Sequence, residues 1–162
     1  MVSRSSPLLP VALRPAVEEW FVETFGRPTR AQTLGWPSIF EGKSTLVFAP
    51  TGSGKTLAAF LATLDRLMFE AAPPRATCRV VYVSPLKALA VDVERNLREP
   101  LAGIARIATR RGDAHRALTV GIRTGDTPAN ERARMQRRPP DLLITTPESL
   151  FLLLTAQARA GL

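Results

Sequence analysis

The chain has 162 residues, with little cysteine, little lysine and no long apolar run. Its one cysteine, Cys78, excludes a disulfide framework within the chain and fits a reducing compartment. The basic start of the chain is followed by an apolar stretch that Pro10 and Arg14 interrupt, which argues against a signal peptide. Apolar runs such as 150–154 are far shorter than a bilayer-spanning helix. These absences favour a protein of the cytoplasm that does not span a membrane.

Acidic residues are scarce beside basic ones, 14 against 22, which leaves a net charge of +8. Nearly all of the cations are arginines, because Lys43, Lys55 and Lys87 are the only lysines. Between Gly103 and Arg138, nine arginines stand against three acidic residues. A basic segment of this kind favours a nucleic-acid partner. The alternative is an arginine-rich composition that gives only solvated helix faces.

The most specific pattern in the sequence is the run Ala49–Thr56, a glycine-rich turn between a short apolar segment and an amphipathic helix. Gly52 and Gly54 allow backbone conformations that a side chain forbids, so consecutive N–H groups can face phosphate oxygens at the start of the helix. Lys55 is expected to reach the β- and γ-phosphates, and Thr56 to ligate Mg²⁺. The run therefore predicts binding of ATP or GTP. The predicted contacts are Thr51, Gly52, Ser53, Gly54, Lys55 and Thr56.

A second candidate nucleotide contact lies upstream, between Phe25 and Gln32. The amide of Gln32 can donate to and accept from adenine at the same time, a pairing that guanine does not satisfy. Phe25 could cover the base. The alternative is an ordinary turn at Gly26 and Pro28 followed by a surface glutamine, and these residues alone leave both interpretations open.

These two runs resemble the Q-motif and the Walker A motif of superfamily 2 helicases of the DEAD/DEAH-box type. Three further runs are similar to other motifs of that family, in the expected order. They are Ser84–Ala90, similar to motif Ia, Arg123–Thr127, similar to the threonine-glycine-aspartate turn, and Thr145–Leu150, similar to motif Ib. Together with Gly35–Pro37, they look most like the Lhr (large helicase-related) group of DNA helicases. The resemblance covers roughly residues 16–160.

The resemblance implies that ATP and Mg²⁺ are the cofactors. It adds Phe25, Arg27 and Gln32 to the nucleotide contacts and implies that Lys55 also contacts the phosphate in the transition state. It further implies sequence-independent binding of single-stranded DNA or a DNA/RNA hybrid, with no membrane association and no obligate oligomer. The implied nucleic-acid contacts are Ser84, Pro85, Lys87, Thr124, Gly125, Thr146 and Pro147.

Two of these runs also have a physical interpretation of their own. Ser84-Pro85 and Thr146-Pro147 each place a hydroxyl before a first-turn proline at a strand-to-helix junction. Free N–H groups at helix starts favour anions, so two such ends along one sheet edge could hold successive phosphates of a strand. Lys87 would add a positive charge there. Plain helix capping is the interpretation that needs no ligand.

The order of predicted elements indicates an α/β fold with a three-layer parallel sheet, as in P-loop NTPases with a RecA-like helicase domain, incomplete at its C-terminus. Expected helices cover 15–24, 55–70, 86–98, 128–137 and 147–158. Expected strands cover 44–49, 78–84, 118–123 and 141–145. The length of the chain and its content of apolar residues are those of a protein with a single hydrophobic core. We expect residues 1–13 to be a flexible N-terminus and residues 14–162 a partial ATP-binding domain.

The sequence contains no Asp-Glu pair, which the family places after motif Ib, and no second RecA-like domain. ATP hydrolysis needs one carboxylate for Mg²⁺, another to orient water, and usually an arginine from the opposing domain. Asp141 and Glu148 are poor substitutes, because Asp141 starts a strand and Glu148 lies in the first turn of a helix. We therefore expect a chain that binds ATP and nucleic acid but does not turn over ATP alone.

The leading interpretation is the N-terminal portion of an ATP-dependent DNA helicase of the Lhr type. Because central strands of the sheet are missing, the isolated chain is expected to be loosely packed or poorly soluble. One alternative is a complete, non-catalytic module that binds nucleic acid in response to ATP. Another is a small-molecule P-loop kinase, which is weaker because Gln32 has no role in it.

Overall fold

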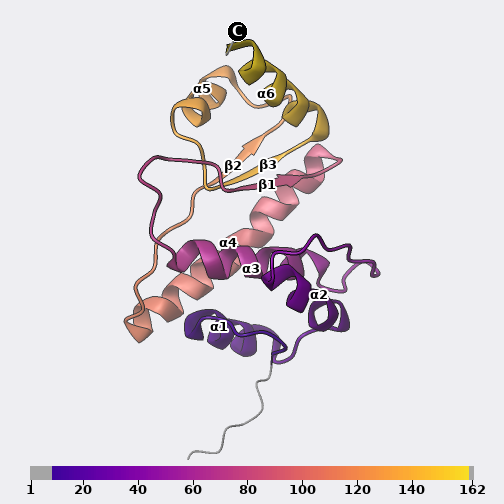
Figure 1. Ribbon diagram of the computed structural model, residues 1–162, viewed down its shortest axis with the longest axis vertical. Helices are drawn as coiled ribbons and strands as arrows, with labels where there is room; N and C mark the ends of the chain where they lie inside the picture. The colour runs from indigo at the N-terminus through magenta and orange to yellow at the C-terminus, as the bar shows by residue number, and fades with distance from the viewer. Residues whose placement is uncertain (1–8, 161–162) are drawn as a thin grey trace, which may run out of the picture. The chain divides into compact units, whose positions relative to one another are not determined.

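The computed structural model describes residues 9–160 of the chain, and the side chains of residues 9–155. Figure 1 shows the helices and strands in their order along the chain. The chain divides into two compact units. The loop unit comprises the described residues up to Glu70 together with Pro100–Arg116, and the sheet unit comprises Ala71–Glu99 and the chain from Ala117 onward.

The predicted flexible N-terminus is described only in part, because residues 1–8 lie outside the described residues, as do residues 161–162 at the other end. Leu9, which belongs to the predicted flexible segment, is buried at 2% exposure. The backbone N–H of Arg14 donates to Asp65 at 2.8 Å, which fixes the chain to the loop unit just before the first helix.

The loop unit is built from three helices and the C-terminal part of a fourth. They are α1 (Pro15–Phe25), α2 (Arg30–Phe40), α3 (Lys55–Phe69) and α4 (Lys87–Arg111). The rings of Phe21 and Trp36 meet edge to face with centroids 5.2 Å apart, so α1 and α2 share an aromatic core. α1 and α3 confirm the helices predicted at these positions. The largest fully buried side chains of this unit include Trp20, Phe21, Trp36, Leu61, Leu64, Leu67, Met68, Ile104 and Ile107.

The helix α2 is absent from the sequence prediction. Its start is fixed by a capping box, in which the Thr29 hydroxyl accepts the backbone N–H of Gln32 and the Gln32 side chain accepts the backbone N–H of Thr29. The pattern Thr-x-x-Gln is a known signal for a helix start, and it was available in the sequence. The alternative of a surface glutamine is excluded, because Gln32 is only 3% exposed.

The helix α4 has 25 residues and extends well beyond residue 98, where the sequence predicts its end. Pro100 favours a helix end, since proline removes a backbone hydrogen bond and clashes with the preceding turn. Buried residues nevertheless continue at helical spacing, with Leu97 before the proline and Ile104 and Ile107 after it. Burial of this apolar stripe offsets the cost of the proline. Among the described residues no helix, α4 included, is long and apolar enough to cross a membrane.

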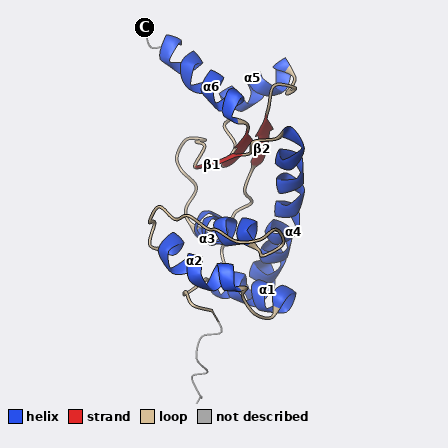
Figure 2. Cartoon of the chain, turned by 90° about the vertical axis from the view of Figure 1, so that its right-hand side faces the viewer, coloured by secondary structure: helices blue, strands red, loops and turns tan. Residues whose placement is uncertain are grey.

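The sheet unit contains three parallel strands in the order β1-β3-β2. The strands are β1 (Val80–Val83), β2 (Val120–Arg123) and β3 (Leu142–Thr145), and the helices are α5 (Ala129–Arg137) and α6 (Pro147–Ala160). Figure 2 shows the strands in red, with α5 and α6 beside them. β3 is central and all four of its residues are buried, as expected for an inner parallel strand. These elements confirm the α/β class and three of the four predicted strands.

The predicted strand at 44–49 is wrong for this structure. These residues form no strand, and their backbone makes no hydrogen bond to other described backbone groups. Leu46 and Phe48 are 87% and 96% exposed. A β-strand exists only through a ladder with a neighbour, and no described segment pairs with this one. The segment has the composition of a strand but lacks a partner.

Candidate nucleotide and nucleic-acid sites

The glycine-rich loop has the backbone geometry that the sequence predicts. Gly52 and Gly54 lie in the left-handed region, with φ of 80° and 82°, where only glycine is unstrained. Gly54 is the N-cap of α3, and its carbonyl accepts the N–H of Ala58 at 2.9 Å. The loop therefore opens directly onto a helix N-terminus, whose free N–H groups favour an anion.

The polar side chains of the loop fit a triphosphate. Lys55 Nζ donates to the carbonyl of Ala49 and, at 2.6 Å, to that of Pro50, so the ammonium is held inside the loop. The hydroxyl of Ser53 is buried and has no hydrogen-bond partner among the described residues. A buried hydroxyl without a partner is costly, and a bound anion with its ion would supply one. Thr56 is exposed in the first turn of α3, where it could reach a metal ion on the phosphates.

The structure brings Gln32 against the phosphate loop. Its amide nitrogen donates to the carbonyl of Gly54 at 3.4 Å, while its oxygen accepts the N–H of Thr29 at 2.9 Å. The Thr29 hydroxyl donates to the carbonyl of Ser53 at 2.8 Å. A Cβ added at Gly54 would lie 2.6 Å from the Gln32 amide nitrogen, so a larger residue would displace this amide as well as strain the backbone at a φ of 82°. The start of α2 therefore holds the loop in place, a role that the sequence analysis missed.

The other two predicted nucleotide contacts, Phe25 and Arg27, lie between α1 and α2. Phe25 is 51% exposed and packs on Trp20 and Phe21, with ring centroids 5.7 and 5.2 Å away. Arg27 is exposed just after the turn at Gly26, whose φ of 72° ends α1. One face of Phe25 is therefore held by the aromatic core, and the ring still has free surface for a base.

The predicted nucleic-acid contacts lie together at the carboxyl edge of the sheet. Each of the three strands ends one residue before a predicted contact, and the strands are parallel and in register, so all three ends meet at one edge. The N–H of Ser84 donates to the carbonyl of Thr145 at 2.8 Å, and the Thr145 hydroxyl donates to the carbonyl of Arg123 at 2.7 Å. The predicted contacts at this edge are Ser84, Pro85, Lys87, Thr124, Gly125, Thr146 and Pro147.

Of the two predicted capping hydroxyls, one is correct and one is not. Thr146 precedes α6, accepts the N–H of Ser149 at 3.5 Å and donates to its hydroxyl at 3.3 Å, as expected for an N-cap before a first-turn proline. Ser84 is fully buried and donates to the carbonyl of Leu86 at 3.0 Å instead. The reason is spacing, because α4 begins at Lys87, three residues after Ser84.

The turn after β2 is held by Thr127, Asp126 and Arg132, which the sequence analysis did not name as contacts. The Thr127 hydroxyl accepts the N–H of Thr124 at 2.9 Å. From α5, Arg132 donates to the carbonyls of Thr127 at 2.6 Å and Gly125 at 3.5 Å. Asp126, at the tip of the turn, accepts two bonds from Lys87. A run of threonine, glycine and aspartate before a proline signals a turn, but the sequence gives no sign of these partners.

The two acids considered in place of the missing Asp-Glu pair have other roles. Asp141 accepts the N–H and the hydroxyl of Thr119 at 2.9 and 2.8 Å, which fixes the start of β3. Glu148 lies in the first turn of α6. Its pKa is lowered by its own backbone N–H first, then by the Thr146 hydroxyl and by Lys87. Both positions agree with the sequence prediction.

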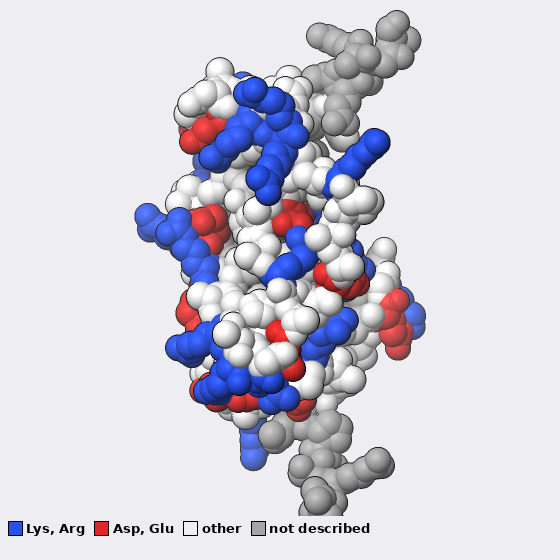
Figure 3. Space-filling view, turned by 90° about the vertical axis from the view of Figure 1, so that its left-hand side faces the viewer, with Lys and Arg blue, Asp and Glu red and all other residues white. Residues whose placement is uncertain are grey.

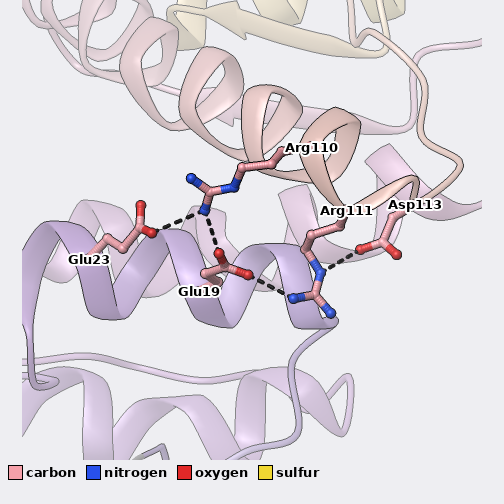
Figure 4. Close-up of polar contacts among 5 residues, drawn as sticks. All are labelled: Glu19, Glu23, Arg110, Arg111 and Asp113. Atoms are coloured by element: carbon pink, nitrogen blue, oxygen red, sulfur yellow. Dashed lines mark hydrogen bonds and ion pairs between the residues drawn. The ribbon is translucent and has the colours of Figure 1, made fainter.

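The basic segment between Gly103 and Arg138 splits into paired and unpaired arginines. In the loop unit, Arg111 bonds Glu19 at 2.7 Å and Asp113 at 3.0 Å, while Arg110 bonds Glu19 and, at 3.1 Å, Glu23 (Figure 4). Bonds from Arg111 and then Arg110 lower the pKa of Glu19. These two arginines join α4 to α1.

In the sheet unit, three arginines at the end of α5 are exposed and have no ion-pair partner within residues 9–155. They are Arg134, Arg137 and Arg138. Figure 3 shows basic side chains in blue, some beside acidic side chains in red and others gathered with few acids nearby. Exposed arginines without an acidic partner are free to attract a polyanion.

The glycine-rich loop that opens a helix, together with the parallel sheet, defines an α/β protein of the P-loop class. The family described as DEAD/DEAH box helicase matches residues 29–161. Because the match covers most of its length, the chain belongs to this family.

Two curated relatives are Lhr proteins. The Lhr helicase and probable uracil glycosylase of Mycolicibacterium smegmatis is 61% identical over 144 residues, which are 89% of this chain and 10% of that protein. The Lhr helicase/uracil glycosylase of Escherichia coli is 53% identical over 163 residues, which are 97% of this chain and 11% of that protein. The resemblance to the Lhr group is therefore confirmed, and the chain spans about a tenth of these relatives.

A solved structure, that of the Mycobacterium smegmatis helicase Lhr bound to ssDNA and AMP-PNP, has the same fold as this chain. The two match with a TM-score of 0.85 and 57% sequence identity, covering 94% of this chain and 19% of that one. The likeness confirms the RecA-like helicase fold predicted from the motifs.

Proposed function

We propose that this chain is the ATP- and single-stranded-DNA-binding portion of an ATP-dependent DNA helicase of the Lhr type. The observation that carries the proposal is the likeness to the M. smegmatis helicase, which is described as bound to ssDNA and AMP-PNP and covers 94% of this chain. Strand separation is proposed for a longer protein, because the chain spans only 19% of that helicase. ATP and DNA must meet in one compartment, so the proposal includes a cytoplasmic location.

The nucleotide is proposed to bind with its phosphates at the N-terminus of α3. Lys55 would exchange its bonds to the loop carbonyls for bonds to the β- and γ-phosphates, and the buried Ser53 hydroxyl would gain a partner. Thr56 would hold Mg²⁺, and Phe25 with Gln32 would bind the adenine. Bound ATP supplies the free energy of phosphoanhydride cleavage, and these residues bind and orient it.

The nucleic acid is proposed to lie along the carboxyl edge of the sheet unit. The first turn of α6 offers N–H groups and Lys87 offers a cation to successive phosphates, and Thr124 and Gly125 would contact the strand from the turn after β2. Contacts of this kind ignore the bases, so binding should be independent of sequence. A DNA/RNA hybrid is the second candidate ligand. The exposed arginines of α5 would raise the rate of encounter.

The rival function, a complete non-catalytic module, is not favoured. The high identity to Lhr helicases over nearly the whole chain supports a portion of a helicase instead. A small-molecule kinase is also disfavoured, because the family match covers residues 29–161 and includes the segment around Gln32.

The test of the proposal is nucleotide binding by two lysine variants. In a titration with a fluorescent ATP analogue, Lys55→Ala should weaken binding by at least about tenfold, the loss expected when a charge-assisted hydrogen bond is removed. Lys43→Ala is the matched control, since Lys43 is exposed and pairs with Glu41 outside the loop. Equal affinities of the two variants would refute the assignment of the loop as the phosphate site.

A further inference from the structure

Lys87 and Asp126 form a close ion pair at the carboxyl edge of the sheet unit. Lys87 Nζ donates to both carboxylate oxygens of Asp126, at 2.8 and 2.7 Å. Lys87 opens α4 after β1, and Asp126 lies in the turn after β2, so the pair links two strand ends. The side chains are 55% and 74% exposed, which leaves the pair open to a nucleic-acid strand.

We propose that Asp126 competes with DNA phosphate for the ammonium of Lys87 and thereby sets the affinity of this edge for single-stranded DNA. The inference rests on the proposed function, in which Lys87 contacts a phosphate. A carboxylate and a phosphate oxygen are alternative acceptors for the same N–H donors. Because two bonds of Lys87 go to Asp126, an arriving phosphate must displace this carboxylate or share the ammonium with it.

A second carboxylate strengthens the competition. The charge of Lys87 also acts on Glu148, where it contributes to the lowered pKa of that group. Glu148 therefore adds negative charge near this ammonium, while the hydrogen-bonded pair is the one with Asp126. A phosphate at Lys87 meets repulsion from both acids, so the contact is weak and readily released.

Removal of the carboxylate charge should strengthen DNA binding. In Asp126→Asn, the side chain keeps its shape and one acceptor oxygen but loses the charge that holds Lys87. We expect binding of single-stranded DNA to become about two- to fivefold tighter at low salt, the range of an exposed ion pair. The slope of log affinity against log salt should become steeper by about 0.7, because Lys87 neutralises one more phosphate.

The experiment measures the fluorescence anisotropy of a labelled oligothymidylate with the full 162-residue chain at several salt concentrations. The matched control is Asp92→Asn, an exposed aspartate on α4 with no ion-pair partner among the described residues. Lys87→Gln and the double variant Lys87→Gln/Asp126→Asn complete a double-mutant cycle, which isolates the interaction between the two residues. Far-UV circular dichroism checks that every variant is folded.

The inference is supported if Asp126→Asn binds more tightly than Asp92→Asn and the gain disappears in the Lys87→Gln background. It is overturned if the two aspartate variants bind equally, if the gain persists without Lys87, or if Asp126→Asn binds more weakly. If the proposed function itself is wrong, the result is different: the unaltered chain does not bind oligothymidylate at any of the salt concentrations.

Discussion

Gln32 has more contacts than the sequence pattern alone indicates. Its amide closes the capping box of α2 and reaches the carbonyl of Gly54 in the phosphate loop. The amide nitrogen nevertheless keeps one N–H donor, and the amide oxygen keeps one lone pair. Adenine requires one donor and one acceptor of this kind. A single residue could therefore fix the loop and read the base.

Gln32→Ala should separate these two roles. Loss of the capping box and of the bond to Gly54 lowers the affinity for every nucleotide, whereas loss of adenine recognition lowers only the preference for ATP over GTP. We expect both, with a several-fold drop in the ratio of ATP to GTP affinity, because one hydrogen bond is worth about 1 kcal/mol. Competition titrations measure the ratio. Gln136→Ala, at an exposed position on α5, is the control.

An unchanged ratio of ATP to GTP affinity in Gln32→Ala would contradict the adenine contact and leave Gln32 as a structural residue only.

The sequence predicted where the glycine-rich loop and the strand ends lie, because glycine, lysine and proline have strong local preferences. It did not predict Asp126, Arg132 or the pairing of Arg110 with α1. These contacts depend on which segments meet in space.

Elements were predicted well where local pattern and packing agree. Three predicted helices have counterparts: α1 for 15–24, α3 for 55–70 and α5 for 128–137. Three predicted strands do as well: β1 for 78–84, β2 for 118–123 and β3 for 141–145. Where the local pattern and the packing disagree, the packing determines the secondary structure. Burial carries α4 through Pro100, and the absence of a ladder partner leaves 44–49 without strand structure in spite of its composition. The missed helix α2 is different, because its capping signal was present in the sequence.

Thr29→Ala tests how the start of α2 supports the phosphate loop. The variant loses the N-cap hydroxyl and the bond from Thr29 to the carbonyl of Ser53. The loss of a threonine N-cap costs about 1 kcal/mol of stability, which corresponds to a decrease of roughly 2–4 °C in Tm for a chain of this size. Because the loop loses an anchor, ATP binding should also weaken. Thermal melts and the fluorescent ATP titration measure the two effects.

Thr33→Ala provides the comparison for Thr29→Ala. The Thr33 hydroxyl is exposed and bonds only the carbonyl of Thr29 within its own helix, so its removal should change stability by less than about 0.5 kcal/mol. If Thr29→Ala lowers Tm but leaves ATP affinity equal to that of Thr33→Ala, the capping box stabilises the helix alone and does not support the loop.

At the scale of the whole molecule, the described residues include two compact units and an apolar segment, 44–49, that belongs to no helix or strand. Exposed apolar side chains occur in 44–49 and on α6, where Phe151 and Leu152 are 66% and 62% exposed. Patches of this kind mark surfaces that bind other chains or promote aggregation.

The exposed segment 44–49 should make the 162-residue chain bind an apolar dye such as ANS, since Leu46 and Phe48 lie almost fully in solvent. The double variant Leu46→Ser/Phe48→Ser should bind clearly less dye and remain soluble at higher concentration, with unchanged far-UV circular dichroism, because neither side chain packs in a core. Leu34→Ser, which removes an exposed leucine within a formed helix, should reduce dye binding less. A sharp two-state melt of the unaltered chain, with no dye bound, would show that this segment is covered in solution and would contradict the exposed arrangement.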